Sequence, residues 1–243
     1  MILYWAWPPD GAGHAVRAAA ICRHLDSEVL VLRGNDDPVV NRALTHFQIP
    51  FIVIAGRHDA IRFAMEMRAK TVVLDDAAGT QLDTIASLYL WRLGRPERPH
   101  RPMPMIRLEG TGSIWPAVML EEEEILSREE AREDLGIDQD AHVRASVTST
   151  CRPGLIEAFD DQVDLVLDEW PALRWMRAAD HVVGAPGFNL WGEVHYCGLP
   201  ATWVKAPHAR DQAVRLQVMP RDEPQLGAAK RIAQMIEQIH QGL

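Results

Sequence analysis

Short apolar runs alternate with stretches of helical spacing along the first half of the chain. Four runs are apolar at nearly every position and predict strands of a parallel sheet that helices cover on both faces; they are residues 2–7, 28–32, 51–54 and 71–74. Apolar residues recur at helical spacing in 14–25, 38–47, 59–69 and about 80–93. This β-α alternation predicts a doubly wound α/β domain.

The alternation stops and then resumes. Four prolines in residues 95–105 are incompatible with a helix interior or a central strand, so a loop is expected there. Residues 106–120 read as extended, and residues 121–135 as a charged helix that ends near Gly136. The second half then repeats the pattern, with strands expected at 143–148, 163–167, 181–183 and 201–204 and helices at about 153–160, 171–178, 189–197, 209–217 and 227–241.

Two doubly wound units follow from this pattern. We expect an N-terminal Rossmann-like domain over 1–120 and a C-terminal one over 121–243, with the final helix a candidate to pack back on the first domain. The composition, 47% hydrophobic and 24% charged, is that of a globular protein with a core. Its 25 Lys and Arg against 34 Asp and Glu give a net charge of −9. This balance argues against a protein that coats nucleic-acid phosphates and leaves a local basic cleft open.

The cysteines and the length of the apolar runs indicate the cellular compartment of the protein. Cys22, Cys151 and Cys197, odd in number and far apart, do not make a disulfide framework or a paired-cysteine metal site, which indicates a reducing environment. The N-terminus has no basic segment followed by a small-residue cleavage site, and no apolar run approaches the roughly 18 residues that span a bilayer. We therefore expect a cytoplasmic protein without a membrane span.

A glycine-rich turn follows the first strand. Gly11 and Gly13 allow the backbone to approach a ligand, and the helix that begins there directs unpaired N–H groups at the same spot. His14 lies in the first helical turn, where positive potential lowers an imidazole pKa and keeps the ring a neutral base. Asp75 and Asp76 follow the fourth strand and reach the same sheet edge, so either is a candidate to orient His14. A helix N-cap is the equal alternative for this pair.

A second glycine-containing turn, residues 184–187, lies between an expected strand and a helix that begins near Asn189. It predicts another anion site lined by backbone amides. Glu193, one helical turn further on, is placed to accept hydrogen bonds from vicinal hydroxyls. Asp211 and Gln212 open a later helix with one acceptor and one amide.

These motifs resemble those of the GT-B glycosyltransferases, including the macrolide and plant UDP-sugar transferases. The shared spacing runs through Gly187-Phe188-Asn189, Glu193, Gly198-Leu199-Pro200 and Asp211-Gln212, and Trp170-Pro171 resembles the tryptophan-proline that opens the plant form. The loop GAGHAVR (11–17) is similar to the histidine-bearing loop of the lipid II-forming transferases. The stretch SREEAREDLGI (127–137) resembles the helix that precedes the first strand of the C-terminal domain.

The resemblance implies two Rossmann-like domains and an inverting transfer of a sugar from a nucleotide-diphosphate sugar, UDP- or TDP-linked, to an acceptor hydroxyl. His14 would be the general base, with Asp75 or Asp76 as its partner. In the donor site, Trp170 would stack on the nucleobase, and Asn189 and the amides of Gly187 and Phe188 would hold the diphosphate. Glu193 would bind the ribose hydroxyls, and Asp211 and Gln212 would bind the sugar. Helix N-termini would meet the diphosphate charge, so no metal or other cofactor is required.

The match has departures. The glutamine that follows tryptophan-proline in the plant form is absent, the spacer from Trp170 to Gly187 is shorter, and the spacer to Asp211 is slightly longer. Core packing is therefore the alternative role of Trp170. Core packing is also the interpretation of the other apolar aromatics at helix or strand spacing, which are Phe188, Trp191 and Trp203.

Two other functions stay open. The loop with His14 and Arg17, together with VLDDAAG (73–79), fits the small nucleotide-sugar hydrolases that resemble the lipid II-forming transferase, in which His14 would activate water. The C-terminal motifs fit a transferase better, so transfer is favoured. A non-catalytic nucleotide-sugar binding subunit is the third hypothesis.

The sequence does not name the acceptor. A small molecule or a lipid-linked sugar would fit, and a modified nucleic-acid base is a lesser candidate. Four tryptophans are a possible lining for a flat acceptor, although core packing is favoured for them: Trp5, Trp7, Trp91 and Trp115. The arginines in 92–107 form a basic, proline-broken segment, for which a solvated loop is favoured over a contact with an acceptor phosphate or a lipid surface.

Overall fold

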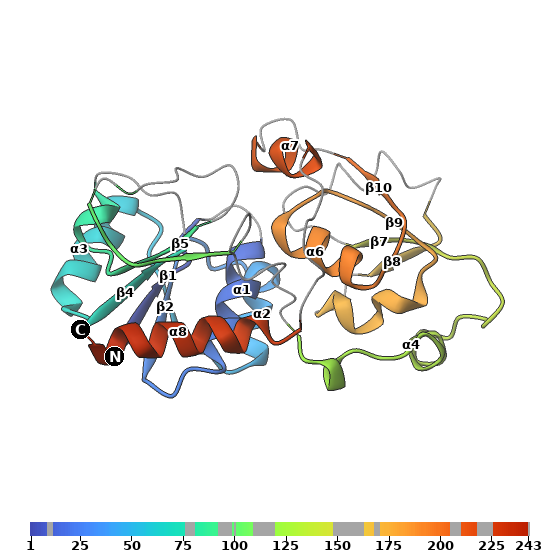
Figure 1. The fold of residues 1–243 in the computed structure, drawn as a ribbon, viewed down its shortest axis with the longest axis horizontal. Helices are drawn as coiled ribbons and strands as arrows, with labels where there is room; N and C mark the ends of the chain where they lie inside the picture. The colour runs from blue at the N-terminus through green and yellow to red at the C-terminus, as the bar shows by residue number, and fades with distance from the viewer. Residues whose placement is uncertain are drawn as a thin grey trace. The chain divides into compact units, whose positions relative to one another are not determined.

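The chain forms two parallel β-sheets, each with helices packed against it (Figure 1). The structure is a computed structural model that describes residues 1–8, 12–75, 81–91, 99, 101–108, 120–147, 163–167, 171–204, 210–217 and 226–242. The first sheet contains β1 (Ile2–Trp5), β2 (Val29–Arg33), β3 (Phe51–Val53), β4 (Thr71–Leu74), β5 (Leu88–Trp91) and β6 (Met105–Arg107). Its strand order is β3-β2-β1-β4-β5-β6, which is the order of a doubly wound nucleotide-binding fold.

The helices that accompany the first sheet are α1 (Gly13–Cys22), α2 (Pro38–His46), α3 (Arg57–Met67), the short 3-10 helix η1 (Leu82–Thr84) and α8 (Ala228–Gly242). Helix α2 shows why these stretches begin where they do. The Asp37 side chain accepts a hydrogen bond from the Val39 N–H at 2.8 Å, and Pro38, which has no N–H to satisfy, occupies the first turn.

Helix α1 is deeply buried against its neighbours in the first unit. Ala15, Ala18 and Ala19 have no exposed surface, and their small side chains let α1 approach β2, α2 and α8 closely. The centre of the sheet is buried on both faces, because every residue of β1 is fully buried. The position of α1 is therefore fixed by packing, and so are the polar side chains that it carries.

Helix α8 is joined to the first sheet by polar contacts as well as by packing on α1. The Glu237 carboxylate accepts hydrogen bonds from the backbone N–H and the hydroxyl of Ser27, at 2.8 and 2.7 Å. His240 Nδ1 lies 2.8 Å from the Thr71 hydroxyl at the start of β4. Burial alone would raise the pKa of Glu237, but the two hydrogen bonds from Ser27 hold it below its ordinary value.

One expected element of this half is wrong. Residues 80–93 were expected to form a fourth helix, but residues 82–84 form only the turn of η1, and residues 88–91 form β5. Leu88, Tyr89 and Leu90 are at most 1% exposed because β5 lies between β4 and β6 with helices on both faces. A strand buried on all sides has the same apolar run as a buried helix, and periodicity alone does not separate them.

The second sheet contains β7 (Arg144–Val147), β8 (Leu165–Leu167), β9 (His181–Gly184) and β10 (Ala201–Trp203) in the order β10-β9-β7-β8. Its accompanying helices are η2 (Glu122–Glu124), α4 (Arg128–Leu135), η4 (Ala172–Ala178), α6 (Phe188–Tyr196) and α7 (Arg210–Gln217). The helix expected over 171–178 is of the 3-10 type, and the helix expected over 153–160 lies outside the described residues.

The charged stretch 121–135 divides into two elements instead of one helix. The glutamate run forms the short η2, and α4 begins after Ser127, whose side chain and that of Glu130 form a reciprocal capping box. Gly136 ends α4 in the left-handed conformation, with a φ of 68°, which a glycine adopts without steric cost. The end of this helix near Gly136 is as expected from the sequence.

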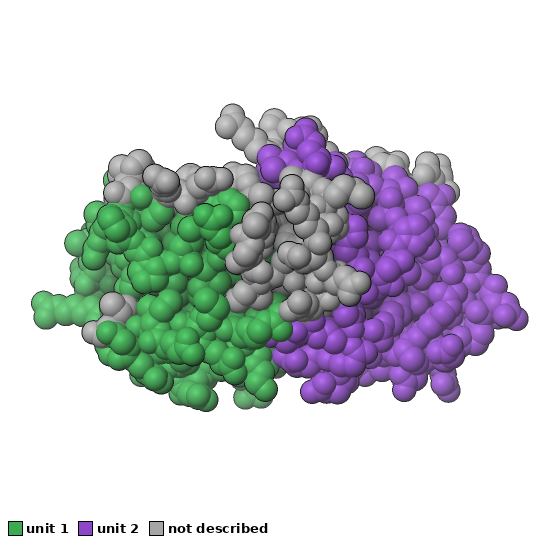
Figure 2. Space-filling view, viewed as in Figure 1, with its two compact units in different colours: residues 1–115, 228–243 green, residues 116–227 purple. Residues whose placement is uncertain are grey.

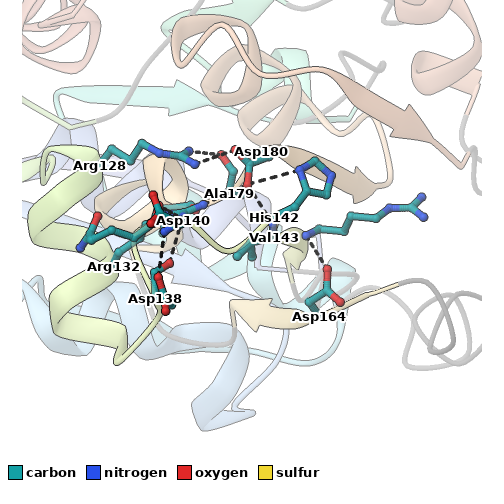
Figure 3. A network of polar contacts seen from close by, with 12 residues as sticks. Arg128, Arg132, Asp138, Asp140, His142, Val143, Asp164, Ala179 and Asp180 are labelled. Atoms are coloured by element: carbon teal, nitrogen blue, oxygen red, sulfur yellow. Dashed lines mark hydrogen bonds and ion pairs between the residues drawn. The ribbon is translucent and has the colours of Figure 1, made fainter.

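A network of charged side chains holds α4 against the second sheet (Figure 3). The Asp180 carboxylate, just before β9, accepts hydrogen bonds from Arg128 at 2.7 Å, from Arg132 at 2.9 Å and from the Val143 N–H at 2.8 Å. Arg132 is fully buried and also donates to the carbonyl oxygens of residues 138, 139 and 178. This network fixes the start of β9, the strand that leads into the second candidate site.

The chain divides into two compact units (Figure 2). The first consists of Met1–Trp115 together with Ala228–Leu243, and the second of Pro116–Gly227. Within the described ranges, no helix has both the length and the apolar character needed to cross a membrane.

Candidate functional site

Four polar side chains meet at the carboxyl edge of the first sheet. Asp75 directly follows β4, and because β4 pairs with β1, the Asp75 N–H donates to the Trp5 carbonyl at 3.1 Å. Tyr4 comes from β1, and His14 and Arg17 come from one face of α1, three residues apart. All four polar side chains belong to residues that are at most 8% exposed. The fold thus brings His14 and Asp75 together, as residues of one buried cluster.

The distances show which group pairs with which. Arg17 binds the Asp75 carboxylate in a bidentate manner, from Nε to Oδ2 at 2.8 Å and from Nη2 to Oδ1 at 2.7 Å. The Tyr4 hydroxyl donates to Oδ2 at 3.2 Å. His14 Nδ1 lies 3.1 Å from Arg17 Nη2 and 3.5 Å from Asp75 Oδ1. The charge of Asp75 is therefore balanced mainly by Arg17, with the His14 ring against one side of this pair.

Tyr4 remains a hydrogen-bond donor throughout the physiological range. Burial and then the neighbouring Asp75 carboxylate raise the pKa of Tyr4 well above its ordinary value. Sequence analysis missed Tyr4, because a tyrosine within the run ILYW looks like an apolar strand residue. It noted Arg17 only as part of the loop motif. The pairing of β1 with β4 is the information that would have identified both.

The start of α1 leaves room for a ligand. Gly13 is the first residue of α1, and a Cβ added there would meet no atom within 4 Å among the described residues. Ala12 provides no side-chain cap, and the first turn contains no acidic residue. The N–H groups of this helix start therefore suit an anionic group. Gly11 and Asp76, which the sequence placed at the same site, lie outside the described residues.

A second buried cation, Arg33, supports the turn that leads from β1 to α1. It is fully buried at the end of β2 and donates to the Asn41 side chain at 3.0 Å and to the carbonyl oxygen of Ala6, with the Pro8 carbonyl at 3.5 Å. Burial lowers the pKa of Arg33 to about 10, although the nearby Asp75 carboxylate acts in the opposite direction. Sequence analysis did not single out Arg33, which is the last residue of an apolar strand.

The second candidate site is the turn between β9 and α6. Gly184 ends β9 and packs closely on α6, because a Cβ there would lie 2.8 Å from Leu190 Cδ2 and that side chain would have to shift. Gly187 is the N-cap of α6 and has no side-chain cap, and no acidic residue lies in the first turn. Phe188 and Asn189 follow in that turn; Phe188 is 7% exposed and Asn189 is half-buried. This arrangement suits the binding of an anion at the α6 start.

Helix α7 is joined to this turn by a buried arginine. Arg215 donates from Nη1 to the carbonyl oxygen of Pro186 at 2.8 Å, and the same nitrogen lies 3.4 Å from the Asp211 carboxylate. Arg215 has no exposed surface. This contact brings Asp211 and the half-buried Gln212, both in the first turn of α7, to the neighbourhood of the β9–α6 turn. Trp170, the remaining residue of the expected donor site, lies outside the described residues.

Glu193 has an unusually high pKa for a carboxyl group. It lies one and a half turns into α6, and burial raises its pKa to about 7. A carboxyl group with a pKa near 7 has an O–H donor below that pH and only accepts hydrogen bonds above it. Hydroxyl groups of a ligand would hydrogen-bond best to its ionised form.

The aromatic residues include fully buried and half-buried side chains. Phe188 and Trp191 are buried in the second unit, as expected from their spacing, and Trp5 and Trp91 are at most 5% exposed in the first. Trp7 is half-buried, and its indole N–H donates to the Ile54 carbonyl at 2.8 Å. Trp115 lies outside the described residues. In the part of the chain that the structure describes, no three His, Cys, Asp or Glu side chains are grouped so that they could hold a metal ion.

No protein-family model matches this sequence, and no curated protein matches it. Among solved structures, the chain is similar to HepE from Anabaena in complex with UDP and glucose, with a TM-score of 0.51 and 14% identity over 98% of this chain and 89% of HepE. Other similar structures are MurG of Acinetobacter baumannii (TM-score 0.44, 14% identity, 99% and 94% of the two chains) and the glycosyltransferase SnogD of Streptomyces nogalater (0.49, 15%, 99% and 94%). The likeness to HepE and the two parallel sheets show that this chain has the GT-B fold, which confirms the fold expected from the sequence.

Proposed function

We propose that the protein is a glycosyltransferase that moves a sugar from a nucleotide-diphosphate sugar to a hydroxyl group of an acceptor. The observation that carries this proposal is the buried cluster of Tyr4, His14, Arg17 and Asp75 at the carboxyl edge of a sheet in a GT-B fold. Ligands of parallel α/β sheets bind outside this edge. A polar side chain next to the positive end of a helix dipole suits a reaction in which negative charge builds up on a departing diphosphate.

The donor in this proposal is a UDP- or TDP-linked sugar. Two features support it: HepE, which shares the fold, binds UDP and glucose, and α6 begins after a glycine N-cap with no acidic residue in its first turn, so its positive dipole end suits a diphosphate. Asn189 and the amides of Gly187 and Phe188 are proposed to bind the phosphates, and Glu193 the ribose hydroxyls. Asp211 and Gln212 are proposed to bind the sugar, and Trp170 to stack on the nucleobase.

The proposed chemistry is an inverting displacement. The acceptor oxygen forms a bond to the anomeric carbon while the bond from that carbon to the diphosphate oxygen breaks, and its electron pair stays on the diphosphate. N–H groups at a helix start stabilise that charge, so the proposal requires no divalent metal. His14 is the proposed catalytic side chain, and Asp75 is its buried partner through the shared Arg17. The acceptor is a hydroxyl compound: a small molecule, a lipid-linked sugar or, with less support, a modified nucleic-acid base.

Hydrolysis of the nucleotide sugar is the second candidate function. The observation that favours it is the contact of Arg17 with both His14 and Asp75, because these residues carry the resemblance to the small nucleotide-sugar hydrolases. The same displacement then takes place with water as the attacking group. Free sugar released in buffer without acceptor would support hydrolysis, whereas release of the nucleotide only after an acceptor is added would support transfer.

Calorimetric titration with UDP, TDP, GDP and ADP tests the proposal. We expect one of the four to bind, with binding weakened by Glu193→Ala. Glu66→Ala is a matched control, because Glu66 is an exposed glutamate on α3. If none of the four nucleotides bound, both the transferase and the hydrolase would be ruled out.

A further inference from the structure

The hydrogen bond between Arg17 and His14 determines which nitrogen of the histidine carries its proton. Arg17 Nη2 lies 3.1 Å from His14 Nδ1. A guanidinium group has only N–H donors and is always charged, so in this contact Nδ1 is the acceptor. A neutral imidazole has one ring proton, which in this case is on Nε2.

The opposite tautomer is less compatible with the distances. It would direct an Nδ1–H group at the Asp75 carboxylate, but Oδ1 is 3.5 Å away, beyond the usual range of about 2.7–3.2 Å for an N–H donor. Both oxygens of Asp75 already accept from closer donors, two from Arg17 and one from Tyr4. The Nδ1–H group would also face an N–H group of Arg17 at 3.1 Å. Two donors at that distance repel each other.

We infer that Arg17 is a positioning residue that fixes His14 in the tautomer with its proton on Nε2. The four side chains are almost fully buried, and Arg17 is held by two hydrogen bonds to Asp75, so this arrangement is built into the fold. The sequence suggested that His14 is a general base, a role that needs an Nε2 without a proton. The geometry points instead to His14 as a hydrogen-bond donor.

The consequence for chemistry rests on the proposed function. His14 Nε2–H donates a hydrogen bond to an oxygen of the diphosphate, and no proton leaves the ring. As the acceptor oxygen bonds to the anomeric carbon, the bond to the diphosphate breaks with its electron pair on the diphosphate oxygen. The proton of the attacking hydroxyl passes to a solvent water molecule, because in an inverting displacement the departing diphosphate lies on the opposite side of the anomeric carbon.

The tautomer is measured directly by long-range ¹H–¹⁵N NMR on the unliganded, ¹⁵N-labelled protein near neutral pH. His14→Gln assigns the His14 signals among those of the ten histidines. We expect Nδ1 to resonate in the range of an unprotonated nitrogen and Nε2 in that of a protonated one. A protonated Nδ1 in the wild-type protein would overturn the inference, and this test requires no variant of Arg17 and no ligand.

Two variants then identify Arg17 as the cause. In Arg17→Lys the donor directed at Nδ1 is lost while the positive charge is kept, so the His14 proton is expected to move toward Nδ1. Tyr4→Phe is the matched control, because it removes one donor to Asp75 and leaves the contact between Arg17 and His14 in place. An unchanged tautomer in a folded Arg17→Lys protein would contradict the assignment. A failure to bind any nucleotide would refute the proposed function without changing either NMR result.

The role of His14 as donor or base is separated by comparing His14→Gln with His14→Ala. The side-chain amide of glutamine presents an N–H donor near the position of Nε2 but does not act as a base. We expect His14→Gln to turn over the nucleotide sugar at least about tenfold faster than His14→Ala, the factor that corresponds to one hydrogen bond to a charged oxygen. Equal loss of turnover in the two variants would contradict the donor role.

Discussion

Replacing Glu193 with Gln is expected to stabilise the folded protein above pH 7 and to leave its stability unchanged near pH 4. Burial raises the pKa of this carboxyl group from its ordinary value of 4.5 to about 7. A carboxyl group whose pKa is higher in the folded than in the unfolded state contributes stability that is fully present below pH 4.5. That contribution is lost as the pH rises through about 7, because the buried group then ionises. Glutamine keeps the shape of the side chain and has no charge to bury.

The size of the effect follows from the same shift. The interval from 4.5 to about 7 corresponds to roughly 3 kcal/mol, at about 1.4 kcal/mol for each pH unit. Glu193 is only half-buried by its exposed surface, so solvent screens part of this penalty, and we expect about 1–2 kcal/mol at about pH 8.5. In a chain of this length that gain corresponds to a rise in Tm of roughly 2–8 °C.

The assay is urea denaturation of the wild type and Glu193→Gln at about pH 5 and about pH 8.5. The difference in the free energy of unfolding is expected to grow with pH. Glu66→Gln, which makes the same chemical change at an exposed position on α3, controls for the change in net charge. A difference that is the same at both pH values, or that favours the wild type at high pH, would refute the reasoning from burial.

Two further predictions concern the contacts that hold helices to the sheets. Arg132→Met should destabilise the protein by about 3 kcal/mol or more in urea denaturation, because it removes the buried partner of Asp180. Arg128→Met, which removes the more exposed arginine bound to the same carboxylate, should cost less than about 1 kcal/mol. Equal losses of stability in the two variants would contradict this ranking. Glu237→Gln should lower stability by about 1–2 kcal/mol at neutral pH. The loss should shrink as the pH falls below 4.5 and through the lowered pKa of Glu237, because the wild-type carboxylate then becomes protonated and its hydrogen bonds from Ser27 weaken; a loss that does not depend on pH would exclude the charged hydrogen bond as its cause.

The fold could be predicted in outline because most of the described strands are short runs in which apolar residues predominate. The expected strand 71–74 coincides with β4, and the expected helix 38–47 differs from α2 only at its end. The helix predicted over 80–93 was wrong because β5 is completely buried. Complete burial removes the polar positions that would reveal the period of two of a strand. The split of 121–135 depends on the Ser127 capping box, a local signal that was present in the sequence and outweighs the continuous run of helix formers.

The candidate sites could be predicted only where function imposes a local signature. Glycines before a helix point to His14, and the position after a strand points to Asp75. Arg17 binds a carboxylate 58 residues away, and this pairing exists only because β1 and β4 are adjacent in the sheet. The sequence therefore suggested a two-residue pair, whereas the structure contains a four-residue cluster in which Arg17 lies between the two expected partners.

Sugar transfer itself is tested most directly by one measurement. The nucleotide sugar whose nucleotide binds in calorimetry is incubated with the wild-type protein and with His14→Ala, with and without hydroxyl acceptors, and the release of nucleoside diphosphate is followed by chromatography. The account predicts acceptor-dependent release by the wild type and a loss of about 100-fold or more in His14→Ala, within the range for removing a charge-stabilising donor from an active site. Equal release by the two proteins, or no release with any acceptor or with water, would contradict it.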